Sequence, residues 1–442
     1  MRSFSIRSLG CKVNQYEGQQ IRQFLLDLGL KEAASGQADL VIINSCSITA
    51  TASAKGRQYL NRARRLNPAA VLVMCGCLPP AGERPHPDDR TIIVTQPDRL
   101  AARLMELIEN AKKPGIIRPQ SLDPTYRLPP PRLFSGHCRA FLKVQDGCDG
   151  SCTYCLVPSL RPTIWSKPMD QVLEEAKALV EAGHKELVLT GINLGAYGQQ
   201  TVRHNRWQQG HNPHLVELIC RLAQVPGLAR LRLSSLDPTD IDPQLLAAMA
   251  AHPNIMPHLH LPLQSGCDQV LKRMGRQYDA ARFLDAVAMA RAYLDRPAIT
   301  TDMIVGFPGE TEEGFQQSIE LAQRIVFAKI HVFAFSPRPG TPAARMSDPV
   351  PPRITRQRCQ VLHKVQSDLA RRFCDQFLGQ QAQVLIEGTQ PHLHGHSQRY
   401  FNVYIEDGQE SSIGPNQIVD VTLIDHHGDG LLARLDHKDH HQ

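Results

Sequence analysis

Three cysteines lie close together in one short stretch of the sequence, DGCDGSCTYC. Cys148, Cys152 and Cys155 form a CxxxCxxC array directly after a predicted strand. Thiolates grouped in this way are well placed to hold an iron–sulfur cluster. Three ligands leave one iron of a four-iron cluster without a protein ligand, and such an iron can bind and activate a small molecule. Zinc is the alternative, but a structural zinc site usually has four protein ligands.

Three further cysteines each follow a separate predicted strand near the N-terminus. Cys11 ends the segment SLGC, Cys46 ends INSC and Cys77 ends CGC. Loops at one edge of a parallel sheet converge, so cysteines that are far apart in sequence can meet there. Spacing alone does not distinguish this from scattered buried cysteines, which are common. The presence of two three-cysteine sets in one chain favours a second metal site.

The elements that position the second set alternate between short apolar runs and helical stretches. This alternation predicts a mostly parallel α/β sheet. We expect strands at 4–10, 39–46, 70–77 and 91–95, and helices at about 15–28, 52–66 and 98–111. Residues 113–137 are rich in proline and predict a linker. The first domain is therefore expected to span residues 1–112.

The alternation resumes after the linker and predicts a complete or partial (β/α)6 barrel. The expected strands are 141–145, 186–190, 231–235, 258–263, 300–306 and 329–335, with amphipathic helices at 169–183 and 310–325 among those that separate them. A basic helix at 353–374 follows, so this domain is expected to span residues 138–374. Residues 375–442 contain short alternating runs separated by Gly, Pro or Asn, which predict a small OB-like β-barrel.

Polar or glycine clusters follow every predicted strand of the barrel. The carboxyl ends of the strands are where such barrels place ligand-binding groups. Besides the cysteine loop and the segments 306–310 and 336–338, the candidates are Thr190, Gly191, Asn193, Ser234, Ser235 and Gln264.

Composition limits the class of protein. The chain has 442 residues, a formal charge of +6 and 42% hydrophobic residues, which excludes a disordered chain. No apolar run approaches the ~20 residues needed to cross a bilayer, and the N-terminus lacks the apolar stretch of a secretory signal. We therefore expect a cytoplasmic protein. Its twelve cysteines then indicate metal or redox chemistry rather than disulfides.

The CxxxCxxC array, with Tyr154 before its third cysteine, resembles that of the radical S-adenosylmethionine (SAM) superfamily. The resemblance implies that the open iron chelates the amino and carboxylate groups of SAM, and that one electron cleaves SAM to a 5′-deoxyadenosyl radical. It also implies that the six strand-end residues named above lie near SAM, with Tyr154 beside the adenine.

Nearly the whole chain is similar to the methylthiotransferases, radical SAM enzymes with an N-terminal cluster domain, a central barrel and a C-terminal TRAM domain. The stretches most similar to the branch acting on N6-threonylcarbamoyladenosine in tRNA are 10–17, 44–55, 189–198, 258–266, 302–311 and 335–343. By this resemblance, Cys11, Cys46 and Cys77 hold an auxiliary 4Fe–4S cluster, and the CxxxCxxC cysteines hold the radical SAM cluster.

The implied reaction uses one SAM to methylate a sulfur held at the auxiliary cluster. A second SAM supplies the radical that removes hydrogen from adenine C2, and methylthio transfer completes the product, at position 37 of the tRNA. The implied partners are tRNA, an electron donor and a sulfur source. Related enzymes usually carry an arginine-rich stretch after the radical SAM cysteines, where this chain has only Arg161 and Lys167.

Charge is unevenly distributed along the chain. Residues 375–442 contain ten acidic and three basic residues, a net charge of −7, which leaves +13 on residues 1–374. Phosphate binding depends on Lys and Arg, so the C-terminal module is not expected to be the main tRNA contact. Better candidates for phosphate contacts are Arg57, Arg62, Arg64, Arg65, Arg353, Arg356, Arg358, Arg371 and Arg372. Each of these arginines could equally lie on a solvated helix face without contacting tRNA.

The remaining cysteines are expected to be packing residues: Cys75, Cys138, Cys220, Cys267, Cys359 and Cys374. Cys75 lies two residues before Cys77 and could substitute for it. Eight histidines lie in residues 375–442. They could form a metal site, but an exposed tail is the favoured interpretation. Tyr400 and Phe401 could stack on bases, although packing in the β-barrel core is favoured.

Two alternative functions remain at this stage. One is a radical SAM enzyme of the same architecture that modifies another tRNA adenosine or a ribosomal protein. The other is a non-catalytic iron–sulfur protein that binds RNA or carries electrons. An iron without a protein ligand argues against a simple electron carrier, whose irons are normally all ligated.

Overall fold

A computed structural model describes residues 1–48, 50–78, 90–95, 99–110, 128–203, 211–390, 392–406 and 413–436. The chain forms two compact units. The first consists mainly of residues 1–135 and the second contains most of the rest. Residues 113–127 of the predicted linker and residues 437–442 of the histidine-rich tail lie outside the described residues. No described helix is both long and apolar enough to cross a membrane.

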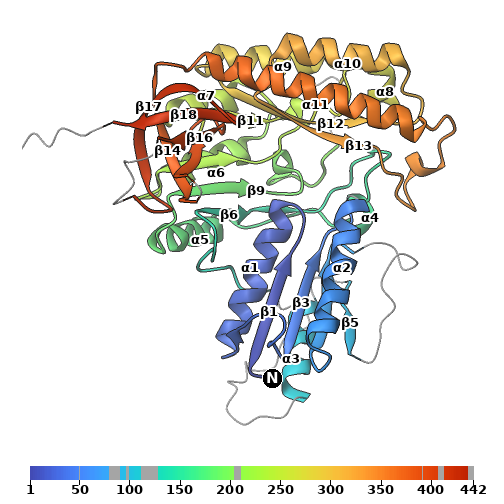
Figure 1. Ribbon diagram of the computed structural model, residues 1–442, viewed down its shortest axis with the longest axis vertical. Coiled ribbons are helices and arrows are strands. Elements are labelled where there is room, and N and C mark those ends of the chain that lie inside the picture. The colour runs from blue at the N-terminus through green and yellow to red at the C-terminus, as the bar shows by residue number, and fades with distance from the viewer. Residues whose placement is uncertain are drawn as a thin grey trace, which may run out of the picture. The chain divides into compact units, whose positions relative to one another are not determined.

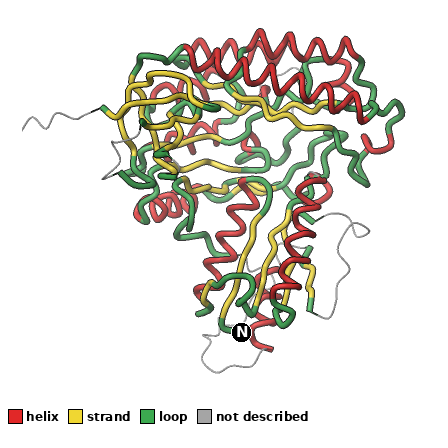
Figure 2. Tube along the Cα trace, viewed as in Figure 1, coloured by secondary structure: helices red, strands yellow, loops and turns green. Residues whose placement is uncertain are grey.

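The first unit is a five-stranded parallel sheet with helices packed on it (Figures 1 and 2). The strand order is β2-β1-β3-β4-β5. The elements are β1 (Ser3–Ser8), α1 (Lys12–Asp27), β2 (Lys31–Glu32), β3 (Leu40–Ser45), α2 (Ala50–Leu66), β4 (Val71–Gly76), β5 (Thr91–Ile93) and α3 (Leu100–Asn110). The predicted parallel sheet is confirmed. Strand β2 was not predicted, because two exposed residues carry no periodic pattern.

Strand β3 is buried along its whole length because helices cover both faces of the sheet. Leu40 and Ile42 belong to one core cluster together with Leu25 of α1. Val41 belongs to a second cluster together with Leu60 of α2. A strand covered on both faces reads as a continuous apolar run rather than an alternating one, which is why this strand was recognisable in the sequence.

The second unit contains a partial barrel of six parallel strands, as predicted. They form two sheets, β6-β9-β10 and β11-β12-β13. Two isolated bridges connect the sheets, one between Leu231 and Ile255 and one between Ser235 and His260. The strands are β6 (Arg139–Lys143), β9 (Glu186–Thr190), β10 (Arg230–Leu233), β11 (His258–His260), β12 (Ala298–Val305) and β13 (Lys329–Ala334). The helices of this unit are α5 (Met169–Glu181), α6 (Pro213–Ala223), α7 (Pro243–Ala251), α8 (Asp268–Arg273), α9 (Ala280–Tyr293), α10 (Glu312–Ile325) and α11 (Pro352–Asp375). The short helix α4 (Val157–Leu160) belongs to the first unit. A short ribbon of β7 (Gln145–Asp146) and β8 (Trp165–Ser166) flanks the cysteine loop.

The C-terminal module is a small closed β-barrel with strand order β14-β15-β16-β18-β17. Its strands are β14 (Gln381–Gly388), β15 (His394–Ser397), β16 (Asn402–Ile405), β17 (Ile418–His427) and β18 (Gly430–Leu435). Phe373 and Phe377, at and just beyond the end of α11, pack into the same core as Val384 and Val403. The barrel was predicted, but β15 was not, because its sequence HGHS lacks an apolar pattern.

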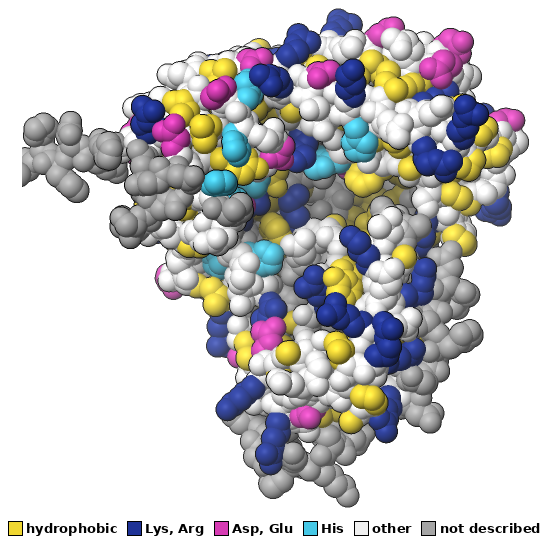
Figure 3. Space-filling model, in the orientation of Figure 1, with side chains coloured by type: hydrophobic (Ala, Val, Ile, Leu, Met, Phe, Trp, Pro, Cys, Tyr) yellow, Lys and Arg dark blue, Asp and Glu magenta, His cyan; other side chains and the backbone are white. Residues whose placement is uncertain are grey.

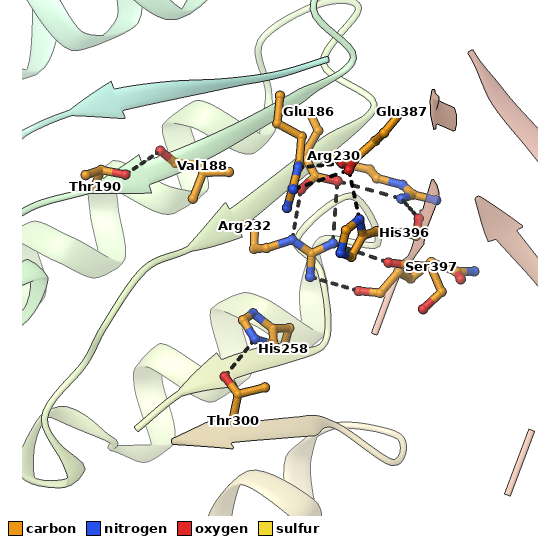
Figure 4. Close-up of polar contacts among 12 residues, drawn as sticks. Glu186, Val188, Thr190, Arg230, Arg232, His258, Thr300, Glu387, His396 and Ser397 are labelled. Carbon is orange, nitrogen blue, oxygen red and sulfur yellow. Dashed lines mark hydrogen bonds and ion pairs between the residues drawn. The ribbon is translucent and has the colours of Figure 1, made fainter. Parts of the chain in front are cut away.

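A buried ionic network fastens this module to strands β9 and β10 (Figure 4). The Glu186 carboxylate accepts a hydrogen bond from Arg232 Nε at 2.9 Å, and Arg232 Nη1 also donates to the carbonyl oxygen of Gln398 at 3.1 Å. Arg230 Nη1 donates to the carbonyl oxygen of His396 at 3.1 Å. Burial alone would raise the pKa of Glu186, but the three arginines around it, Arg232 most of all, hold it below its usual value.

The two aromatic residues considered for base stacking both pack against other residues of the second unit. The Tyr400 ring lies 4.7 Å from the His396 ring and 4.8 Å from the His258 ring, measured between centroids. The guanidinium of Arg232 lies 4.8 Å from the centroid of the same ring. Phe401 is 9% exposed and belongs to the β-barrel core. Packing in the β-barrel core is therefore confirmed for Phe401, whereas the half-buried Tyr400 lies outside that core and packs against His258 and Arg232.

Candidate functional site

The three N-terminal cysteines meet at the carboxyl edge of the parallel sheet. Cys11 is the N-cap residue of α1 after β1, Cys46 follows β3 directly, and Cys77 follows β4 directly. Burial, with smaller contributions from Cys11 and Cys77, raises the pKa of the Cys46 thiol to about 12. All three thiols therefore lie near one another at this edge, as the convergence of loops predicts.

Two glycines allow this approach. Gly10 has φ +95°, and a Cβ added there would lie 2.4 Å from Cys46 Cβ and 2.7 Å from Cys46 Sγ. Gly76 has φ +91°, and its Cβ would lie 2.5 Å from the carbonyl oxygen of Ser45. Residues with a side chain rarely adopt a positive φ, and distances this short leave no room for a Cβ atom. The glycine before Cys11 and the glycine before Cys77 therefore bring these cysteines against the end of β3.

Asn14, on the first turns of α1, ties the same loops together. Its Nδ2 donates to the carbonyl oxygens of Leu9 at 3.1 Å and Ser45 at 2.6 Å. Its Oδ1 accepts from Cys77 Sγ at 3.7 Å. The sequence reasoning did not single out this residue, and its only signal was its place three residues after Cys11.

Cys75 does not substitute for Cys77. It is 1% exposed and belongs to the apolar cluster that contains Ile21 and Leu25 on one face of the sheet. Residues two apart in a strand share a face, so Cys77 would join Cys75 if the strand continued. Strand β4 ends at Gly76, however, and the sulfur of Cys77 contacts Asn14 instead. This confirms that Cys75 is a packing residue. Cys267 and Cys374 are likewise buried in apolar clusters.

The CxxxCxxC loop presents three sulfurs that each accept an N–H hydrogen bond. The backbone N–H of Gly150 donates to Cys148 Sγ at 3.3 Å, and that of Val157 donates to Cys155 Sγ at 3.4 Å. N–H groups directed at sulfur stabilise the thiolate form that a metal requires. Burial raises the pKa of the Cys148 thiol, and the nearby Cys152 adds a smaller contribution in the same direction.

The third sulfur is contacted by an arginine that the sequence reasoning missed. Arg276 Nη1 donates to Cys152 Sγ at 3.2 Å. Asp237 accepts from Arg276 Nη2 at 2.7 Å, and the hydroxyl of Tyr278 accepts from Nε at 3.0 Å. Arg276 follows α8 and lies 124 residues from Cys152 in sequence, so only the fold brings the two together.

The predicted SAM-binding residues occupy the carboxyl ends of the barrel strands. Thr190 ends β9, and its hydroxyl donates to the carbonyl oxygen of Val188 at 3.0 Å (Figure 4). The backbone N–H of Asn193 donates to Gln145 Oε1 at 2.8 Å. Ser234 and Ser235 follow β10. Gly191 packs against the Gln145 side chain, where a Cβ would lie 3.0 Å from Gln145 Oε1.

Gln264 and Tyr154 are the two members with distinctive surroundings. Gln264 has φ +65°, a conformation that costs a non-glycine residue of order 1–3 kcal/mol and is often associated with functional sites. Backbone pairing to β12 holds it there, because its N–H donates to the carbonyl oxygen of Asp302 at 2.8 Å and its own carbonyl oxygen accepts from Ile304 at 2.9 Å. The Tyr154 ring packs edge-on against Phe307 at 6.4 Å.

Comparison with known proteins agrees with this geometry. Residues 142–322 match the family model described as Radical SAM superfamily, and residues 3–87 match the one described as Uncharacterized protein family UPF0004. The chain is 36% identical to the threonylcarbamoyladenosine tRNA methylthiotransferase MtaB of Thermotoga maritima, over 88% of this chain and 87% of that protein. The chain belongs to the radical SAM methylthiotransferases. Membership implies a 4Fe–4S cluster and SAM.

Other relatives support the same family. The MtaB protein of Bacillus subtilis is 33% identical over 96% of this chain and 94% of its own length. The tRNA-2-methylthio-N(6)-dimethylallyladenosine synthase of Zymomonas mobilis is 34% identical over 96% of this chain and 95% of its own length. Among solved structures, the radical SAM methyltransferase TsrM of Kitasatospora setae has a TM-score of 0.52 and 15% identity, covering 78% of this chain and 77% of that one. That last likeness concerns the fold alone.

The two cations that this methylthiotransferase keeps after its CxxxCxxC array are structural. Arg161 Nη1 donates to both carboxylate oxygens of Asp146, at 2.9 and 2.8 Å. Lys167 forms an ion pair with buried Glu175. Both side chains are buried, so they support the loop from within rather than contact a ligand from its surface.

The basic residues considered for phosphate binding divide into two groups. Arg358 is buried and forms ion pairs with Glu310 at 2.8 Å and Glu312 at 3.0 Å, so the prediction that it contacts tRNA is wrong. Arg64 is half-buried and donates to Thr91 Oγ1 at 3.0 Å. Figure 3 shows basic side chains on the exposed surface of the first unit. The exposed members of the predicted set are Arg57, Arg62 and Arg65 on α2, and Arg353, Arg356, Arg371 and Arg372 on α11.

Proposed function

We propose that this enzyme converts N6-threonylcarbamoyladenosine at position 37 of tRNA into its 2-methylthio derivative. The observation that carries the proposal is the meeting of Cys11, Cys46 and Cys77 at one sheet edge, in a chain that also holds a CxxxCxxC array. Inserting sulfur requires a second site besides the one that cleaves SAM. Relatives named for threonylcarbamoyladenosine are 33–36% identical to the chain, and the sequence stretches 258–266 and 335–343 resemble the same branch.

We infer that Cys148, Cys152 and Cys155 hold the radical SAM cluster and that Cys11, Cys46 and Cys77 hold an auxiliary 4Fe–4S cluster. When bound, the first supplies the electron that cleaves SAM and the second an open iron for the sulfur that is transferred. The donor sets fit, because each set offers three thiols and leaves one iron open. The N–H groups of Gly150, Val157 and Arg276 stabilise the first set as thiolates, and Asn14 orients the second.

The strand-end residues would bind and orient SAM. Ser234, Ser235 and the side-chain amides of Asn193 and Gln264 can hydrogen-bond to ribose and amino-acid oxygens, each bond contributing about 0.5–1.5 kcal/mol. Because the Thr190 hydroxyl already donates to Val188, we expect Thr190 and Gly191 to contact SAM through backbone atoms. Tyr154 would lie beside the adenine.

The partners that the reaction requires are tRNA, an electron donor and a sulfur source. The exposed arginines of α2 and α11 are the proposed phosphate contacts, because the C-terminal barrel carries excess negative charge. A cytoplasmic location stays a prediction.

The test is mass spectrometry of tRNA nucleosides from cells with and without the gene. We expect 2-methylthio-N6-threonylcarbamoyladenosine to disappear without the gene and to return with the wild-type gene. A gene encoding Cys148→Ala, Cys152→Ala and Cys155→Ala serves as the matched control and should not restore it. Loss of 2-methylthio-N6-dimethylallyladenosine instead would assign the chain to the reaction named for its Zymomonas relative.

A further inference from the structure

Two histidines and an aspartate, none of them used in the proposed cluster or SAM sites, converge in the barrel. His260, Asp302 and His331 each offer one donor atom, and the three atoms lie within 4.8 Å of one another. His260 Nε2 is 3.4 Å from Asp302 Oδ2, and the two imidazole centroids are 5.9 Å apart.

The register of the parallel strands places these side chains on one face of the sheet. His260 on β11 pairs with Thr300 on β12, and Asp302, two residues further along β12, pairs with His331 on β13. Residues that alternate along a strand share a face. Thr301 and Met303, which point to the other face of β12, are 0% and 1% exposed, whereas the side chain of Asp302 is 30% exposed. The cluster therefore lies on the more open face of β12, and His331 is exposed to solvent.

A second layer of contacts orients His260. Thr300 Oγ1 lies 3.0 Å from His260 Nδ1 and 3.0 Å from His258 Nε2 (Figure 4 shows the second contact). With Nδ1 engaged by Thr300, His260 directs Nε2 toward Asp302. Metal-binding histidines usually have their second ring nitrogen held in this way.

We propose that His260, Asp302 and His331 form a site for a divalent cation. Two imidazole nitrogens and one carboxylate oxygen suit Mn²⁺, Fe²⁺, Co²⁺ or Zn²⁺. Donors bound to one such ion at ~2.1 Å lie roughly 3.4 Å apart in a tetrahedral arrangement, the separation that His260 and Asp302 already have. A rotation of the exposed His331 side chain brings in the third donor.

The cation offers a means of recognising the substrate, a step that rests on the proposed function. Three protein ligands leave coordination positions open, and hard oxygen donors such as carboxylates fill them readily. The threonylcarbamoyl group carries a carboxylate, whereas a dimethylallyl group carries none. A cation at this site would therefore favour the threonylcarbamoyl substrate.

The direct test is binding of Mn²⁺, followed by the loss of the EPR signal of the free aqueous ion. Mn²⁺ is chosen because thiols compete poorly for it. The anaerobically reconstituted full-length protein is washed with chelator and titrated. We expect one Mn²⁺ per chain, and at least tenfold weaker binding for Asp302→Asn and for His331→Ala. The matched controls are Asp285→Asn on α9 and His363→Ala on α11, exposed residues outside the cluster, which should bind like the wild type.

Equal binding by all five proteins, or no binding by the wild type, would overturn the cation site. The substrate step is read separately, as the KM for tRNA containing N6-threonylcarbamoyladenosine. We expect Asp302→Asn to raise this KM at least fivefold, with a smaller change in kcat, and an unchanged KM would refute that step. If the wild type binds Mn²⁺ but does not methylthiolate this tRNA, the proposed function fails and the cation site stands. If it methylthiolates without binding Mn²⁺, the reverse holds.

Discussion

The guanidinium of Arg276 lies 3.2 Å from the sulfur of Cys152, and Asp237 holds the opposite side of the same guanidinium at 2.7 Å. Tyr278, which fixes Nε of this arginine, itself donates to the backbone carbonyl of Leu263 at 3.2 Å. Gln264, one of the predicted SAM-binding residues, is the next residue in the chain. One chain of contacts thus links Cys152, a proposed cluster ligand, to the segment that follows strand β11.

We expect Arg276→Gln to lower the reduction potential of the radical SAM cluster. Hydrogen bonds to ligand sulfurs are among the factors that set cluster potentials, and a positive donor favours the more negative reduced state. A hydrogen bond to a charged group is worth ~1.5–3 kcal/mol. Only the part of this energy that differs between the oxidised and the reduced cluster changes the potential. A one-electron change of 59 mV corresponds to ~1.4 kcal/mol, so we expect a shift of a few tens of millivolts, measured by spectroelectrochemistry.

Lys272→Gln is the control for this prediction, because it removes an exposed cation from α8, close to Arg276 in sequence. Its potential should match that of the wild type. An equal potential in Arg276→Gln would show that the N–H···S contact does not act on the cluster.

We expect Gly10→Ala to lose the auxiliary cluster while keeping the other. The added Cβ would fall 2.4 Å from Cys46 Cβ at a positive φ, so Cys11 would be forced away from Cys46. Iron should fall from about eight to about four per chain, the difference of one 4Fe–4S cluster. Gly36→Ala, whose Cβ would meet nothing closer than 3.9 Å, should keep the full iron content. Eight irons in Gly10→Ala would contradict the assigned geometry.

We expect Glu186→Gln to destabilise the second unit. Removing the charge leaves Arg232 and Arg230 buried without their common partner, and breaking a buried pair in this way costs about 3–5 kcal/mol. Because the pKa of Glu186 lies below its usual value in the folded protein, its contribution is present above the unfolded pKa and is lost as the pH falls through the folded value. Denaturant unfolding at neutral pH measures the loss. Glu217→Gln, in an exposed pair with Arg221, should change stability by less than ~1 kcal/mol.

We expect Arg353→Gln, Arg356→Gln, Arg371→Gln and Arg372→Gln together to weaken tRNA binding. Each lost phosphate contact reduces the slope of log affinity against log salt by about one, so the combined variant should show a markedly flatter salt dependence. Arg434→Gln, which removes an exposed cation from the acidic C-terminal barrel, should bind like the wild type. If the combined variant keeps the wild-type slope, α11 is not the contact surface.

Much of the architecture was predictable because its signals are periodic. The buried strands of both units and the amphipathic helices at 169–183 and 310–325 repeat apolar residues at recognisable intervals. The approach of Cys11, Cys46 and Cys77 was predictable because loops of a parallel sheet converge at one edge. Strands β2 and β15 escaped prediction because they are too short or too polar to carry a pattern.

The residues around the sites were less predictable, because their partners are distant in sequence. Nothing near Arg276 indicates that it contacts Cys152, and nothing near His331 indicates that it faces Asp302. The prediction for Arg358 was wrong for the same reason, because its partners are also distant in sequence. A basic residue on a basic helix predicts an exposed cation, but the fold places Arg358 against Glu310 and above the Phe315 ring.

The central claim is that the two cysteine sets do different work. Its most direct test is the combined variant Cys11→Ala, Cys46→Ala and Cys77→Ala, incubated with SAM, a reductant and tRNA containing N6-threonylcarbamoyladenosine. We expect 5′-deoxyadenosine to form, because the CxxxCxxC array has its own three ligands, and no 2-methylthio nucleoside to appear. A variant that still installed the methylthio group would contradict the account, because Cys11, Cys46 and Cys77 would then be structural residues.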